Sequence, residues 1–112
     1  MLRIVWGTFV CLGLLVAAQA ATAPSQVARG RQIYIADGCQ QCHGYGGQGT
    51  VGPRIAPNPI PLELFSRQVR NPRGVMPVYT AKVLSDADLA SIYAYMNSIS
   101  QPAPVAKIPL LR

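Results

Sequence analysis

Histidine, cysteine and acidic side chains are all scarce in this 112-residue chain. It has one histidine, three cysteines and four Asp or Glu residues, against ten Lys or Arg residues. Structural zinc usually takes four Cys or His ligands in two spaced pairs, which this chain does not offer. No segment shows an alternating strand pattern, so the βαβ context of a thioredoxin-like redox pair is also missing. Aromatic residues are few and the cations are scattered, which argues against a nucleic-acid partner.

The N-terminus has the composition of an export signal. Arg3 precedes an uncharged apolar run over residues 4–18, and the run ends in the small-residue sequence AQA at 18–20. This pattern predicts a secretory signal peptide over residues 1–20 and a periplasmic location. The alternative is an uncleaved anchor, against which the shortness of the run argues because a spanning helix needs about 20 apolar residues. Contact with a membrane is expected only if this segment is retained.

Residues 21–112 keep nine of the ten basic residues and all four acidic ones. Such an excess of positive charge favours association with an acidic partner or an anionic surface, and it does not bear on the fold. A chain of this size buries a modest fraction of its surface, so a group other than side chains is a candidate for completing its core.

Only two cysteines, Cys39 and Cys42, remain beyond the predicted signal, and the single histidine, His43, follows the second directly. In an oxidising compartment a local disulfide is one interpretation of such a pair. The Cys-x-x-Cys-His order is typical of a different use, the covalent attachment of haem. The two thiols form thioethers with the vinyl groups on one edge of the ring. The histidine then lies under the iron as its proximal ligand.

The sequence at this point resembles the class I cytochrome c family, and the matching segments extend over most of the chain beyond the signal. These segments are GRQIYIADGCQQCHG (30–44), GPRI (52–55), GVMPVY (74–79) and LSDADLASIYAYMNSI (84–99). The resemblance implies an all-α fold of about three helices wrapped around one covalently bound haem c, with the first and last helices crossing. The haem domain is expected over residues 21–100, followed by a proline-rich tail over 101–112.

Three helices are expected from the residues themselves. The first covers about 25–37, the second 62–70 with Leu62, Phe65 and Val69 inward, and the third 86–98 with Ser85 as its N-cap. Gly30 lies inside the first helix at a cost of about 1 kcal/mol relative to alanine, which points to close packing there. By the resemblance, its partner is the last helix near Tyr93.

The sixth iron ligand cannot be histidine, because the chain has no second one. Met96 lies on an apolar helical stripe with Leu89 and Ile92, the usual place for a core methionine. Met76 lies between Gly74 and Pro77 in a segment that cannot be a regular helix. Since the family presents its ligand from a Met-Pro loop, Met76 is the expected distal ligand, with Lys82 and Lys107 as remote alternatives.

The resemblance also implies roles for residues around the haem. The carbonyl of Pro53 would accept a hydrogen bond from the ligand histidine, which fixes the tautomer and strengthens the imidazole as a donor. Ile55 would pack on the ring and Tyr79 would line the pocket near Met76. Candidates for contacts to the propionates are Arg54, Asn58, Arg67, Arg70 and Arg73, and for each of them a solvated role on the surface is an equal alternative.

The expected function is one-electron transfer between periplasmic redox partners, with no catalysed reaction. The chain would serve as a diffusible shuttle or as the cytochrome subunit of a dehydrogenase. Its partners would be redox proteins with acidic docking surfaces: a dehydrogenase, a terminal oxidase or a reductase. The alternative is a haem protein whose distal site opens to a gas or a peroxide. That alternative normally needs a distal acid or base, and the sequence offers no second histidine for it.

Overall fold

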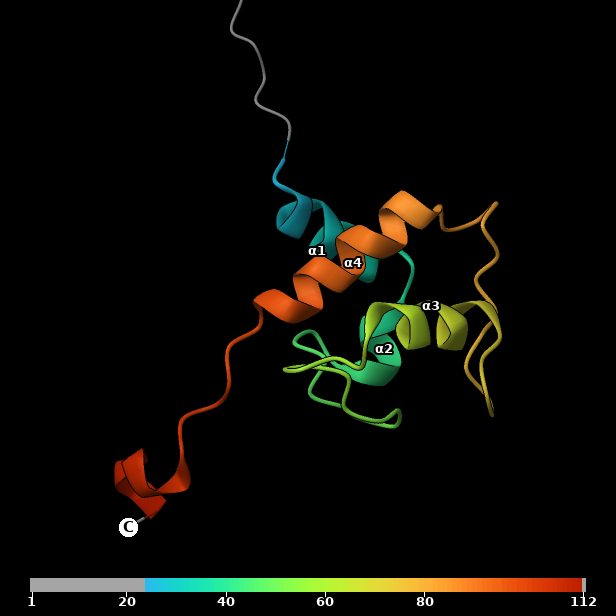
Figure 1. The fold of residues 1–112 in the computed structure, drawn as a ribbon. Coiled ribbons are helices and arrows are strands. Elements are labelled where there is room, and N and C mark those ends of the chain that lie inside the picture. Colours follow the sequence, from blue (N-terminus) through green and yellow to red (C-terminus); the bar gives the residue numbers. More distant parts are fainter. Residues whose placement is uncertain (1–23, 112) are drawn as a thin grey trace, which may run out of the picture.

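The computed structural model describes residues 24–111, and no strand occurs in that range. The predicted signal peptide, residues 1–20, lies outside the described residues. Figure 1 shows the helices in chain order. They are α1 (Gln26–Ala36), α2 (Cys39–His43), α3 (Leu62–Arg70) and α4 (Asp86–Ser98), with two short 3-10 turns, η1 (Val105–Lys107) and η2 (Pro109–Leu111), in the tail. None of these helices is long and apolar enough to cross a bilayer.

Serine side chains cap the N-termini of the two longest helices. Ser25 accepts a hydrogen bond from the Ala28 amide at 3.2 Å, and Ser85 accepts one from the Asp88 amide at 3.1 Å. Each cap satisfies an amide that has no partner inside its own helix. Asp88 also pairs with Arg29 at 2.6 Å, which links the first turn of α4 to α1. The hydrogen bonds from Arg29 and Ser85 hold the pKa of the Asp88 carboxyl below its ordinary value.

Helices α1 and α4 cross in direct contact (Figure 1), as the resemblance implies. Gly30 is buried at this crossing, where a Cβ atom would collide with the carbonyl of Ser91 and lie 2.9 Å from the Ile92 amide nitrogen. The atoms nearest to such a Cβ therefore belong to the backbone of Ser91 and Ile92, directly before Tyr93 on α4. The Tyr93 ring packs edge-on against Phe65 of α3, with ring centroids 5.4 Å apart. The glycine allows α4 to approach α1 at backbone distance, and the aromatic residue fixes α3 to α4.

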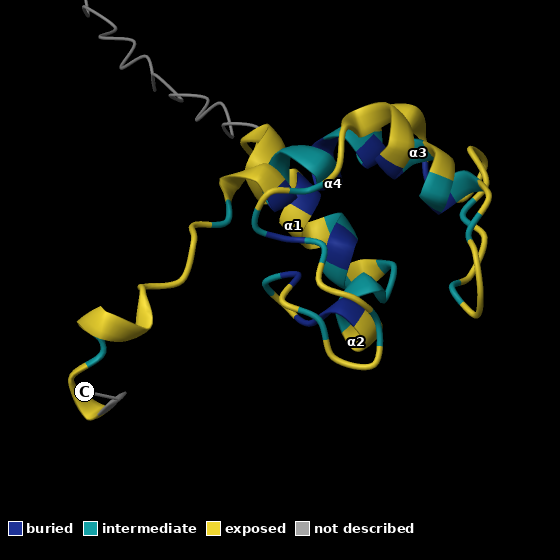
Figure 2. Ribbon diagram, turned by 60° about the horizontal axis from the view of Figure 1, so that its bottom comes forward, coloured by how far each residue is buried: buried dark blue, intermediate teal, exposed yellow. Residues whose placement is uncertain are grey.

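The core is formed around α4, which packs against both α1 and α3. Figure 2 shows the buried residues of the chain in dark blue. Its members are Tyr34, Ala56, Phe65, Val69, Leu84, Leu89, Ile92 and Met96. Tyr34 has no exposed surface, and its hydroxyl donates to the Gly44 carbonyl at 2.7 Å. Leu62 was expected inward with Phe65 and Val69, but it is 42% exposed. This first residue of α3 lies beyond the edge of the core.

The C-terminal tail runs away from the body of the molecule after α4 (Figure 1). Its prolines prevent α4 from continuing, and only the short turns η1 and η2 follow. Val105 and Leu110 are largely exposed there. The Cys-x-x-Cys-His motif and the core thus lie entirely in the part of the chain that precedes the tail.

Candidate functional site

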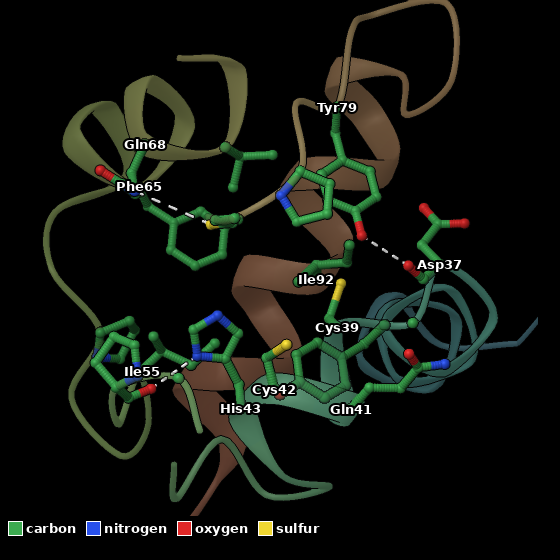
Figure 3. Close-up of a pocket in the computed structure, with 18 of the residues that line it drawn as sticks. Asp37, Cys39, Gln41, Cys42, His43, Ile55, Phe65, Gln68, Tyr79 and Ile92 are labelled. Atoms are coloured by element: carbon green, nitrogen blue, oxygen red, sulfur yellow. Dashed lines mark hydrogen bonds between the residues drawn. The ribbon is translucent and has the colours of Figure 1, made fainter. Parts of the chain in front are cut away.

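Helix α2 is a single turn formed by the Cys-x-x-Cys-His motif itself. Gly38 precedes it with φ of 79° and Gly44 follows it with φ of 76°, a left-handed region that glycine adopts without strain. Within the turn Cys39, Cys42 and His43 are spaced i, i+3 and i+4, which places their side chains on one face. Both cysteines are free thiols, so the local disulfide is not formed. Figure 3 shows both sulfur atoms and the imidazole directed into the same cavity.

Burial raises the pKa of the Cys39 thiol to about 11, and the nearby Asp37 carboxylate adds to this shift. The thiol is therefore mostly protonated at neutral pH. In the part of the chain that the structure describes, no three His, Cys, Asp or Glu side chains are arranged to hold a metal ion.

His43 is held in one tautomer. Its Nδ1 lies 2.7 Å from the carbonyl oxygen of Pro53. Because a carbonyl only accepts hydrogen bonds, Nδ1 carries a proton, and in the neutral ring the lone pair is then on Nε2. His43 is 8% exposed, and its Nε2 faces the interior of the cavity (Figure 3). An imidazole that is held in this way, with Nε2 directed into a cavity, suits the role of an axial metal ligand.

The loop after α2 folds back tightly and delivers Pro53 to the histidine. The Gly52 amide donates to the Cys42 carbonyl at 2.8 Å, and the Thr50 hydroxyl donates to the same oxygen at 2.6 Å. A Cβ atom on Gly52 would lie 3.0 Å from that oxygen and 3.1 Å from Cε1 of His43. A side chain at this position would therefore displace the imidazole. The glycine is needed for the loop to pass this close.

A cavity of about 940 Å³ lies above the motif, and all seven residues expected at the haem line it. They are Cys39, Cys42, His43, Pro53, Ile55, Met76 and Tyr79. Helix α2 forms one wall, while Phe65 of α3 and the loop that carries Met76 form the opposite one (Figure 3). The volume is at the upper end of the usual range for small-molecule sites. The lining is mostly apolar, which suits a large flat ring.

Tyr79 closes the cavity on the side of the Met76 loop. Its hydroxyl donates to the Asp37 carbonyl at 2.8 Å (Figure 3). Burial raises the pKa of this phenol, so the hydroxyl remains a donor well above neutral pH. The contact links the loop to the backbone two residues before Cys39.

Residues 25–96 match the family described as cytochrome c oxidase, cbb3-type, subunit III. The chain is also 34% identical over 104 residues to the cytochrome c subunit of 4-cresol dehydrogenase (hydroxylating) from Pseudomonas putida, across 93% of this chain and 88% of that protein. The chain belongs to the cytochrome c family. No solved structure matches it significantly.

The cofactor of this cytochrome is haem c, held covalently, and its function is electron transfer. The residues present fit the group. One wall of the cavity offers the thiols of Cys39 and Cys42 and the Nε2 atom of His43, and the remaining lining is largely apolar. Members of the family act as electron carriers and not as enzymes. Cytochromes c are typically exported proteins.

The structure also revises the polar surroundings of the haem site. Arg54, Asn58 and Arg73 line the cavity, whereas Arg67 and Arg70 do not. Arg67 pairs with Glu63 at 2.7 Å on the surface of α3. Gln68 was not anticipated, and its Nε2 lies 4.0 Å from the sulfur of Met76 (Figure 3). Its position three residues after Phe65 on α3 was the available signal, because i and i+3 share a helix face.

Proposed function

We propose that this cytochrome is an exported periplasmic electron carrier that works as the cytochrome subunit of a dehydrogenase. The division into a signal peptide (1–20), a haem domain (21–100) and a tail (101–112) is part of the proposal. The composition of the N-terminus supports export. The similarity to a dehydrogenase cytochrome subunit, which extends over 93% of the chain, supports a partner of that kind.

His43 and Met76 are the proposed axial ligands, and Cys39 and Cys42 the proposed thioether positions. The observation that carries this proposal is the cavity, which has the motif on one wall and the Met76 loop on another. When bound, haem supplies one-electron oxidation and reduction at its iron. His43 donates from Nε2 while Pro53 holds its other nitrogen. Met76 completes the coordination and closes the distal side, which favours electron transfer over ligand binding and raises the reduction potential.

Removal of the Met76 thioether is expected to open the distal site. The oxidised wild-type protein should show a low-spin spectrum with the weak far-red band of methionine ligation. Met76→Ala should lose that band and become high-spin in both oxidation states. Its reduced form should then bind carbon monoxide, which the wild type should resist. Absorption spectra of the purified exported protein, with and without carbon monoxide, measure all three changes.

Met96→Leu is the matched control, because it removes the other methionine of the haem domain at nearly constant volume. It should keep the far-red band. A wild-type spectrum that is already high-spin and responds to carbon monoxide would refute the closed site. The chain would then be assigned to binding of a gas or a peroxide.

Docking to an acidic partner surface is proposed from the charges beside the haem cavity. Arg54 and Arg73 line the cavity and are exposed, whereas Asp37 is the only acidic residue among the lining side chains. Positive charge at the site of electron exchange attracts acidic surfaces and loses its effect as salt screens it.

Small charged oxidants test this directly on the reduced holoprotein. Oxidation by anionic hexacyanoferrate(III) should slow by roughly threefold to tenfold between low and high ionic strength, while oxidation by cationic tris(1,10-phenanthroline)cobalt(III) should speed up. The double variant Arg54→Gln/Arg73→Gln should flatten both dependences, and Arg67→Gln, away from the cavity, should not. Equal salt dependences for the two oxidants would contradict a basic docking surface.

A further inference from the structure

The loop that carries Met76 has no regular secondary structure, yet three hydrogen bonds hold it at a single residue, Tyr79. The Tyr79 hydroxyl donates to the Asp37 carbonyl at 2.8 Å, at the junction of α1 and α2. Its amide donates to the Val69 carbonyl of α3 at 3.2 Å. Its own carbonyl accepts a hydrogen bond from Arg70 Nη1 at 2.8 Å. The amide, the carbonyl and the hydroxyl of Tyr79 therefore each make a hydrogen bond to a helix or to a junction between helices.

Arg70 makes two directed contacts from the last turn of α3. Nη1 donates to the Tyr79 carbonyl, and Nη2 donates to Asp86 Oδ1 at 2.6 Å. The Arg70 side chain is 19% exposed. Water therefore reaches it much less than it reaches the side chain of Arg67, whose pair with Glu63 is exposed. The planar guanidinium can hold both acceptors at once, which the single ammonium of lysine cannot do in the same geometry. Asp86 begins α4, so Arg70 joins α3, α4 and the loop.

Tyr79 is separated from Met76 by only Pro77 and Val78. Proline fixes its own φ and restricts the residue before it, so the short connection is stiff. A fixed Tyr79 therefore leaves the Met76 side chain little freedom to move away from the cavity. Release of Tyr79 would let the loop swing outward without unfolding α1 or α4.

We propose that Arg70 and Tyr79 form a clamp that keeps the Met76 loop closed and sets how readily a foreign ligand displaces Met76. The proposal rests on Met76 being the distal ligand, as stated under the proposed function. Neither residue is assigned to the iron. Tyr79 acts by anchoring the loop, and Arg70 acts by holding Tyr79.

The test is a titration of the ferric holoprotein with imidazole, which competes with Met76 for the iron, followed through the loss of the far-red band. Tyr79→Phe keeps the ring and removes only the hydroxyl. It should raise the imidazole affinity by about threefold to tenfold, the range that one neutral hydrogen bond supports. Arg70→Gln removes a charged donor and should raise the affinity by about tenfold to a hundredfold. Arg70→Lys, which keeps one donor, should fall between wild type and Arg70→Gln.

Two arginine variants serve as matched controls. Arg67→Gln lies on the same helix and breaks only the exposed pair with Glu63, and Arg29→Gln breaks the pair between α1 and α4, which involves neither Arg70 nor Tyr79. Both should leave the imidazole affinity within twofold of wild type, even where Arg29→Gln lowers the free energy of unfolding. If the clamp acts as proposed, the imidazole affinity rises only when a hydrogen bond that holds the Met76 loop is lost. A lower free energy of unfolding alone does not change it.

The outcomes separate the two proposals. A wild type that shows the far-red band, with Tyr79→Phe and Arg70→Gln variants at wild-type imidazole affinity, overturns the clamp and leaves Met76 ligation standing. Affinities that rise equally in Arg29→Gln also overturn it, because general destabilisation would then explain the effect. A wild type without the band overturns Met76 ligation and the clamp with it. If Arg70→Gln does not fold, Tyr79→Phe alone decides between the first two outcomes.

Discussion

Gly30→Ala is expected to lower the free energy of unfolding by about 1–3 kcal/mol, although alanine is the better helix former by about 1 kcal/mol. The added Cβ atom would collide with the Ser91 carbonyl and lie 2.9 Å from the Ile92 amide nitrogen. These are backbone atoms, so no change of rotamer removes the clash. Helices α1 and α4 must move apart, and the contacts along their crossing are weakened together. Denaturant unfolding of the holoprotein, followed by circular dichroism, measures the loss.

Gly46→Ala is a suitable control for the added methyl group. The only atom near a Cβ there is Oε1 of Gln48 at 3.3 Å, the end of a flexible side chain. Gly46 has no positive φ, so alanine fits its backbone conformation. This variant should unfold within about 0.5 kcal/mol of wild type. A Gly30→Ala protein as stable as wild type would mean that the crossing is looser than the structure has it.

Local sequence signals were sufficient for the three longer helices. The ranges expected from apolar spacing and serine caps, 25–37, 62–70 and 86–98, differ from α1, α3 and α4 by no more than one residue at any end. Each of these signals acts within a turn or two of the chain. Helix α2 was not expected as a helix. It is one turn long and exists between two left-handed glycines, which a short motif does not reveal by its own periodicity.

The contacts between helices were harder to anticipate. The backbone of α4 can lie against Gly30 only at a residue with a small side chain, and Ser91 is such a residue. Tyr93, two residues further along α4, points about 200° away because each residue turns the helix by about 100°. Its ring packs against Phe65 of α3. The resemblance gave the correct pair of helices, and the structure shows which backbone atoms lie nearest to Gly30.

The anchoring of the Met76 loop could not be predicted from one sequence. Tyr79 and Asp37 are 42 residues apart, and the acceptor is a backbone carbonyl, which leaves no mark on residue identity. Arg70 was expected beside the propionates because of its charge alone. The structure instead directs it to Tyr79 and Asp86, since the turn of α3 that carries it faces the start of α4. The charge of an arginine predicts that it donates hydrogen bonds. The fold determines which acceptors lie within its reach.

Substitutions of the two methionines of the haem domain should have separate effects. One should lower the free energy of unfolding, and the other should change the coordination of the iron. Met96 is completely buried in the core, and its sulfur is close to Gly47, where a Cβ atom would lie 3.2 Å from it. Met96→Ala leaves a void that rigid helices fill poorly, so the free energy of unfolding should fall by about 2–5 kcal/mol. The far-red band of the folded fraction should be unchanged, because Met96 does not line the haem cavity.

Met76→Ala should behave in the opposite way, since Met76 lies at the cavity and not in the fully buried core. Its loss should remove the proposed iron ligand and with it the far-red band, while the packing of α1 against α4 should remain intact. Met96→Leu, which nearly conserves volume, should cost less than about 1.5 kcal/mol and keep the band. Unfolding curves and oxidised spectra of the three variants give a direct comparison. Loss of the band in Met96→Ala but not in Met76→Ala would reverse the ligand assignment. The cavity wall formed by the Met76 loop would then face the haem without coordinating it.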